Sequence, residues 1–69
     1  MKKFMVSYYG TNPFTGKHEV SIYKNTFGGN YIIYLDNDFW TNINSLYEFE
    51  DELKFIEKSI NTKFGFLGF

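Results

Sequence analysis

Few residues in this chain could carry acid–base or nucleophilic chemistry. It has a single histidine, His18, next to Glu19, and it has no cysteine. A thiol–imidazole pair or a histidine-rich metal site therefore cannot be assembled within one chain. A serine-based triad would need His18 beside one of four serines, none of which has the nucleophile-elbow pattern. We interpret His18 as a surface residue at the head of a strand and predict no catalytic residue and no enzymatic activity.

A calcium site is the next chemistry that the residue types suggest. Asp36 and Asp38 have the spacing of the first two ligands of a calcium-binding loop. Such a loop would need an oxygen ligand at Trp40, a glycine at Thr41 and a glutamate at Tyr47. Because none of these is present, the two aspartates are interpreted as part of a turn, and neither a metal nor a cofactor is predicted.

Acidic side chains are concentrated in SLYEFEDELKFIEKSI, residues 45–60. Ser45 and Glu48 have the spacing of a capping box, which predicts a helix with Ser45 as its N-cap. Apolar residues then recur at steps of three and four residues, which predicts one face packed on the rest of the domain. This stripe consists of Leu46, Phe49, Leu53, Ile56 and Ile60.

Phe55 is the aromatic residue of this helix that the apolar stripe leaves out. The neighbouring acids have an ordinary explanation, because early acids and late lysines complement the helix dipole and pair at i,i+4. A phenylalanine on the polar side has no such explanation and needs cover, either from the C-terminal tail or from a partner. The predicted partner-binding surface is Tyr47, Glu48, Asp51, Glu52 and Phe55.

Three alternating segments, residues 2–9, 18–25 and 30–36, predict strands. Turn formers at 10–17 and 26–29 join them into an antiparallel meander. The segment 36–44, polar apart from three residues, is not assigned a strand, and FGFLGF at the end either folds back or adds a fourth strand. The predicted fold is α+β: a three-stranded antiparallel β-meander with one C-terminal α-helix packed across it, in a single domain over residues 1–69.

Composition narrows the function classes. Nine Phe, six Tyr and one Trp supply a core for a short chain without disulfides. Residues 1–35 hold four lysines against one glutamate, a net charge of +3, and residues 36–69 hold three lysines against seven acids, a net charge of −4. The chain has no arginine, which argues against sequence-specific DNA reading.

The compartment is predicted from what the sequence lacks. The N-terminus has no signal-peptide pattern, and no segment has the roughly 20 apolar residues that span a bilayer. Together with the absence of cysteine this predicts a soluble protein of the cytoplasm that does not bind a membrane. A composition rich in Lys, Asn, Ile, Tyr and Phe is typical of an AT-rich coding sequence, such as that of a phage or mobile element of a low-GC bacterium.

The favoured hypothesis is a non-enzymatic protein–protein interaction module. It would bind and inhibit a host protein and would be encoded by a phage or mobile element. In size and acidic second half the chain is similar to small inhibitors that imitate nucleic acid. That resemblance implies helix acids standing in place of phosphates.

Two alternatives belong to other classes. A single-stranded nucleic-acid binder would stack bases on sheet aromatics, and the tail KFGFLGF resembles the aromatic strand motif of cold-shock domains. The acidic helix beside that tail favours a tail that closes the core instead. The other alternative is a structural homodimer whose exposed rings meet. The nucleic-acid surface would consist of Tyr8, Tyr23, Tyr31, Phe64 and Phe66 with Lys2, Lys3, Lys17 and Lys24.

Overall fold

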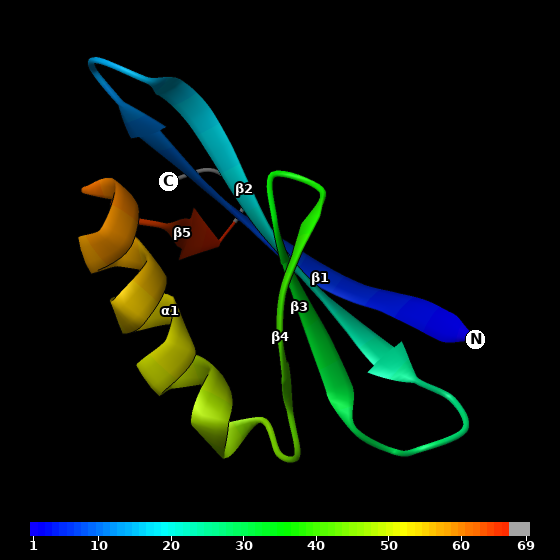
Figure 1. The fold of residues 1–69 in the computed structure, drawn as a ribbon. Helices are drawn as coiled ribbons and strands as arrows, with labels where there is room; N and C mark the ends of the chain where they lie inside the picture. Colours follow the sequence, from blue (N-terminus) through cyan, green and yellow to red (C-terminus); the bar gives the residue numbers. More distant parts are fainter. Residues whose placement is uncertain (67–69) are drawn as a thin grey trace.

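One twisted antiparallel sheet and one helix make up residues 1–66 (Figure 1). A computed structural model describes residues 1–66, and the part of the predicted tail beyond Phe66 lies outside the described residues. The strands lie side by side in the order β4-β3-β2-β1-β5, and α1 runs along one face of the sheet. The elements are β1 (Lys2–Asn12), β2 (Gly16–Asn25), β3 (Tyr31–Leu35), β4 (Asp38–Ile43), α1 (Tyr47–Ile60) and β5 (Gly65–Phe66).

The predicted α+β fold is confirmed. β1, β2 and β3 form the antiparallel meander, and α1 follows them in the chain. The C-terminal tail adds a strand, as one of the two predicted options, because β5 pairs antiparallel with β1 through Tyr8–Phe66 and Tyr9–Gly65.

β4 is a strand that the sequence did not predict. It pairs with β3 along its whole length, and the register shifts by one residue at Trp40, between the pairs Tyr34–Phe39 and Ile33–Thr41. This bulge interrupts the alternation of side chains by which a strand is recognised. The turn before β4 was predicted correctly: Asp36 and Asn37 both have positive φ, 52° and 69°, as a two-residue hairpin turn requires.

The core lies between α1 and the middle of the sheet. Val20, Ile33, Ile43 and Ile56 are buried there and form one cluster. Phe49, Leu53 and Ile60 of the predicted apolar stripe pack against it together with Tyr31, Leu35, Trp40 and Phe64. The helix therefore packs on the sheet through the predicted face.

The first turn of α1 differs from the prediction. Leu46, not Ser45, occupies the N-cap position, and no side chain caps the helix there. Instead the Glu48 carboxylate accepts hydrogen bonds from the backbone N–H groups of Asn44 and Ser45, at 2.9 and 3.1 Å. Since Leu46 lies outside the helical turns, it is 46% exposed and does not join the core.

The end of α1 is tied to the β1–β2 hairpin by Asn12, which is buried. Asn12 Nδ2 donates to the carbonyls of Ile60 (3.3 Å) and Asn61 (2.8 Å), while its Oδ1 accepts from the N–H groups of Phe14 (2.7 Å) and Thr15 (3.1 Å). Asn61 adopts the left-handed conformation that ends many helices. One side chain thus satisfies groups in two separate turns.

Candidate protein-binding ridge on the helix

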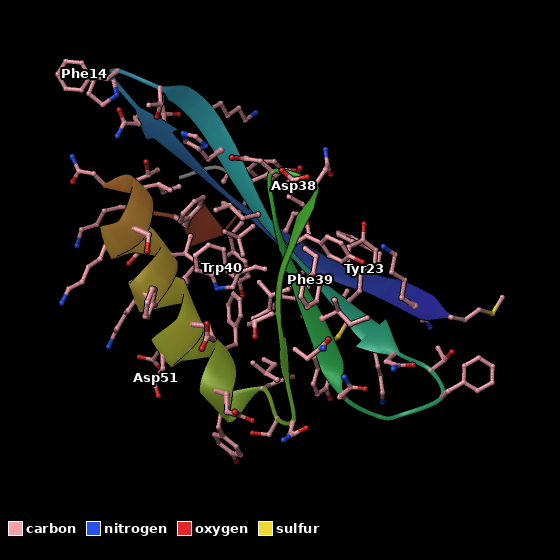
Figure 2. All side chains as sticks on the ribbon, in the orientation of Figure 1. Phe14, Tyr23, Asp38, Phe39, Trp40 and Asp51 are labelled. Carbon is pink, nitrogen blue, oxygen red and sulfur yellow. The ribbon has the colours of Figure 1, made fainter. Side chains whose placement is uncertain are left out.

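Three of the five residues predicted to bind a partner lie together on the outward side of α1. Tyr47, Asp51 and Phe55 follow one another at steps of four residues, and the tyrosine and phenylalanine are 93% and 62% exposed. In Figure 2 the side chain of Asp51 points away from the sheet. With the two lysines between and after them they form a surface that we call the α1 ridge: Tyr47, Asp51, Lys54, Phe55 and Lys58.

Glu48 and Glu52, the other two predicted residues, have partners within the fold. Glu48 binds the two backbone amides before the helix. Glu52 Oε1 accepts a hydrogen bond from the indole N–H of Trp40 at 3.2 Å. Both carboxylates therefore position α1 against the chain around it, and they are less available to a partner.

The ring of Phe55 is covered only in part. Its neighbour is Trp40 of β4, whose ring meets it edge to face with centroids 6.2 Å apart. Figure 2 shows Trp40 between the sheet and α1. The tail does not provide cover in the described residues, because β5 lies at the opposite edge of the sheet, beside β1. The sequence analysis offered two ways to cover Phe55, the C-terminal tail or a partner, and the described part of the tail does not cover it.

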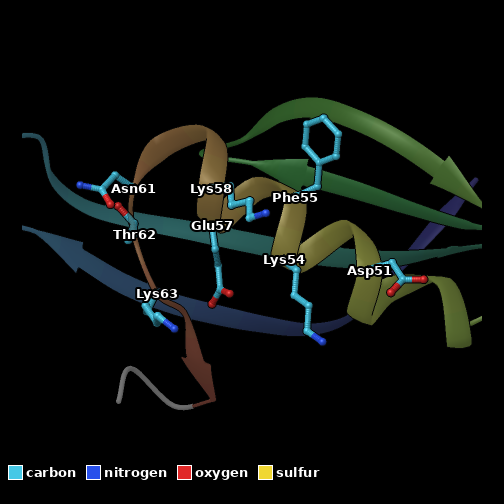
Figure 3. A pocket seen from close by; sticks show the side chains of 8 residues that line it. All are labelled: Asp51, Lys54, Phe55, Glu57, Lys58, Asn61, Thr62 and Lys63. Atoms are coloured by element: carbon cyan, nitrogen blue, oxygen red, sulfur yellow. The ribbon is translucent and has the colours of Figure 1, made fainter.

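A groove of about 660 Å³ lies beside the ridge, between the second half of α1 and the segment leading to β5 (Figure 3). One carboxylate oxygen of Glu57 already has a partner within the fold: Oε2 accepts a hydrogen bond from the Phe64 N–H at 2.9 Å. Within residues 1–66, neither Lys58 nor Lys63 has a carboxylate at ion-pair distance. The groove is lined by Asp51, Lys54, Phe55, Glu57, Lys58, Asn61, Thr62 and Lys63.

The surface predicted for nucleic acid is not assembled. Tyr8 lies under the helix with its ring 5.3 Å from that of Phe49, and Tyr31 and Phe64 pack against the core. The side of the sheet away from α1 is open. The register partners Phe4 and Tyr23 lie on this open side, so the next register partners, Lys3 and Lys24, lie on the side that faces α1. Of the five predicted aromatics, Phe66 has no described side chain, and Tyr23 is the one on the open side of the sheet.

The open side of the sheet carries aromatic residues that the sequence analysis did not group. Consecutive rings lie 5.5, 5.2 and 6.3 Å apart, all edge to face. Lys2 Nζ lies above the two middle rings and donates to the hydroxyl of Tyr34 at 2.7 Å. Figure 2 shows two members of the row on the side away from α1. This open-face row consists of Phe4, Tyr23, Tyr34 and Phe39.

His18 lies near the start of β2, as predicted, and it also has hydrogen-bond partners within the fold. Its side chain is 15% exposed and bonds on both sides: Nε2 is 2.7 Å from Thr15 Oγ1, and Nδ1 is 2.7 Å from Asp36 Oδ2. Asp36 Oδ1 in turn accepts from the N–H of Glu19 at 2.8 Å. The order hydroxyl, imidazole, carboxylate is that of a nucleophile activated by a base.

The surroundings of Thr15 favour a structural role for this cluster. Acyl transfer also needs N–H donors directed at the developing oxyanion. Among the described residues, the N–H groups of Phe14 and Thr15 itself both donate to Asn12. The cluster instead joins the β1–β2 turn to the β3–β4 turn, two segments that are close only in the folded sheet.

Replacing His18 with alanine is expected to lower the free energy of unfolding by about 0.5–1.5 kcal/mol, because Thr15 Oγ1 and Asp36 Oδ2 lose their hydrogen bonds to the imidazole but remain accessible to water. Urea unfolding followed by circular dichroism measures this change. Lys17→Ala is the control, since that neighbouring side chain lies over the Tyr9 ring and has no part in the cluster. Equal unfolding midpoints for the two variants would contradict the structural role.

Within residues 1–66 no three His, Asp or Glu side chains lie close enough to hold an ion. The described part of the chain contains no helix with the length and hydropathy needed to cross a bilayer. No protein-family model, curated protein or solved structure matches the chain.

Proposed function

We propose that this chain is a protein-binding module that contacts its partner through the α1 ridge. The observation that carries the proposal is Phe55, which stays 62% exposed although Trp40 lies against its edge. The core beneath α1 is closed by the next residue, Ile56, and the Phe55 ring is not part of that core cluster. Burial of this ring and of Tyr47 on the same side of α1 by a partner would remove apolar surface from water, which is favourable.

The rest of the ridge has the composition of an interaction surface. Tyr47 is a second exposed aromatic residue, and aromatic residues dominate the binding energy of most protein interfaces. Asp51 and Lys58 are charges of opposite sign on the same side, and such charges at an interface select the partner and its orientation. The expectation of an inhibitor directed at a host protein belongs to this proposal and uses the same ridge.

Imitation of nucleic acid receives less support than general protein binding. A mimic needs several carboxylates free to replace phosphates. Glu48 and Glu52 are engaged by backbone amides and by Trp40, and Lys54 and Lys58 share the ridge with Asp51. The ridge therefore presents mixed charge around two rings.

Site-specific photo-crosslinking tests the proposal. Phe55 is replaced with p-benzoylphenylalanine, and the protein is irradiated in cells of its source organism. We expect a discrete covalent adduct with a protein. The matched control carries the same probe in place of Phe14, which is 91% exposed at the tip of the β1–β2 hairpin and away from the ridge. The absence of an adduct at position 55, or the same adduct at both positions, would refute the ridge as the contact surface.

A further inference from the structure

We propose that the partner of the α1 ridge is a second copy of this chain, with the two ridges paired antiparallel about a twofold axis. This inference rests on the proposed function, because it names the partner of the same surface. It also predicts that the purified chain associates with itself when no other protein is present. A different protein that binds the ridge would then compete with the second copy.

The order of charges along the ridge is the first argument. Asp51 lies in the first half of α1 and Lys58 two turns later, on the same outward side. Antiparallel pairing about an axis between them places Asp51 of each copy against Lys58 of the partner subunit, twice in one dimer. Parallel pairing would place like charges together. The two helix dipoles are also opposed in the antiparallel arrangement, which is their favourable orientation.

Phe55 is the second argument. In the register that joins positions 51 and 58, positions 54 and 55 meet at the axis. The Phe55 ring of each copy is then covered by the aliphatic part of Lys54 of the partner subunit and by the symmetry-related ring. Lys54 is free to adapt, because its contact with Glu50 is 3.6 Å long and both side chains are largely exposed. The pairing thus supplies the cover that Trp40 gives only in part.

The ends of the two ridges fit each other as well. The same register brings Tyr47, 93% exposed at the start of α1, to the level of Thr62 of the partner subunit. The groove of about 660 Å³ lies there, with Lys58 and Lys63 on its walls (Figure 3). Each copy contributes one ring and one groove, which is the self-complementarity that a twofold interface requires.

The open-face row is a poorer surface for a second copy. The ammonium group of Lys2 lies above the rings of Tyr23 and Tyr34 and gives this row a positive charge. Two such faces stacked about a twofold axis through the row would bring one lysine against the other. The α1 ridge has charges of both signs, so one antiparallel register can place Asp51 of each copy against Lys58 of the partner subunit. One helix against another makes a small interface, so we expect a concentration-dependent equilibrium and not a permanent dimer.

Analytical ultracentrifugation with charge-reversed variants tests this pairing. The unmodified chain is expected to show a monomer–dimer equilibrium. Asp51→Lys and Lys58→Glu should each weaken it by about tenfold or more, because each creates two contacts between like charges. An equimolar mixture of the two variants should dimerise as well as the unmodified chain, since every contact across the axis is then between opposite charges. Lys17→Glu, a charge reversal on the open side of the sheet, is the control and should leave the equilibrium unchanged.

Two results would overturn the inference: a chain that stays monomeric up to about 1 mM, or a mixture that fails to recover dimerisation. The rescue by mixing also shows that both variants fold. A monomeric chain whose Phe55 position still crosslinks to another protein would refute the second copy and leave the proposed function standing. A monomeric chain that gives no adduct would refute both.

Discussion

Replacing Ile56 with alanine is expected to remove a large part of the free energy of unfolding. Ile56 is fully buried and contacts the cluster of Val20, Ile33 and Ile43 that joins α1 to the sheet. Removing a buried isoleucine side chain down to alanine costs about 2–5 kcal/mol. A domain of this length has a total stability of roughly 3–10 kcal/mol, so the substitution removes a large part of it.

The measurement is urea unfolding followed by circular dichroism and by tyrosine and tryptophan absorbance. Leu46→Ala is the matched control. The sequence pattern places Leu46 in the same apolar stripe, but the side chain lies before the first turn of α1 and is 46% exposed. We expect this control to change the free energy of unfolding by less than about 1 kcal/mol. Similar losses for the two variants would contradict the packing of α1 described above.

Replacing Asn12 with alanine is expected to cost about 3 kcal/mol, because four hydrogen bonds of a buried side chain disappear together. The N–H groups of Phe14 and Thr15 lose their acceptor, and the carbonyls of Ile60 and Asn61 lose a donor. The hairpin and the end of α1 should loosen at the same time. Hydrogen exchange at the amides of both segments would record that coupling.

Asn12→Asp separates the two halves of this contact. The aspartate keeps an acceptor for the two turn amides but places a carboxylate against the carbonyls at the end of α1, where the helix dipole is negative. We therefore expect it to be at least as destabilising as alanine at neutral pH. Asn42→Ala, at an exposed asparagine of β4, should change stability by no more than about 0.5 kcal/mol. If Asn12→Asp were as stable as the unmodified chain, the bonds to α1 would contribute nothing.

The meander and the helix could be predicted because each has a regular period that agrees with its packing. β4 could not, because it contains a bulge: Trp40 is an extra residue between the pairs Tyr34–Phe39 and Ile33–Thr41, so the alternation before it does not continue after it. A strand with an inserted residue loses the period of two from which it would be predicted. The turn residues before it, Asp36 and Asn37, were informative, and a two-residue turn already implies a strand on each side.

Helix periodicity correctly grouped Tyr47, Asp51 and Phe55 on one side of α1. For Glu48, the capping-box spacing already implied the bond from the Ser45 N–H. Helix periodicity could not show that Glu52 has a partner outside the helix, since Trp40 comes close only in the folded chain. The same limit applies to His18. Its partner Asp36 is distant in the sequence, and the β2–β3 pairing brings the two together.

The contact between Trp40 and Phe55 gives the molecule a built-in spectroscopic reporter. Trp40 is the only tryptophan in the chain, and its indole N–H is hydrogen-bonded to Glu52 next to the ridge. Indole emission shifts with the polarity and hydration around the ring, so any protein that covers Phe55 changes the environment that Trp40 reports. Excitation at the red edge of the absorption band avoids the six tyrosines. Occupancy of the ridge can therefore be followed in unlabelled protein, and a titration of the chain against itself or against a candidate partner uses the same signal.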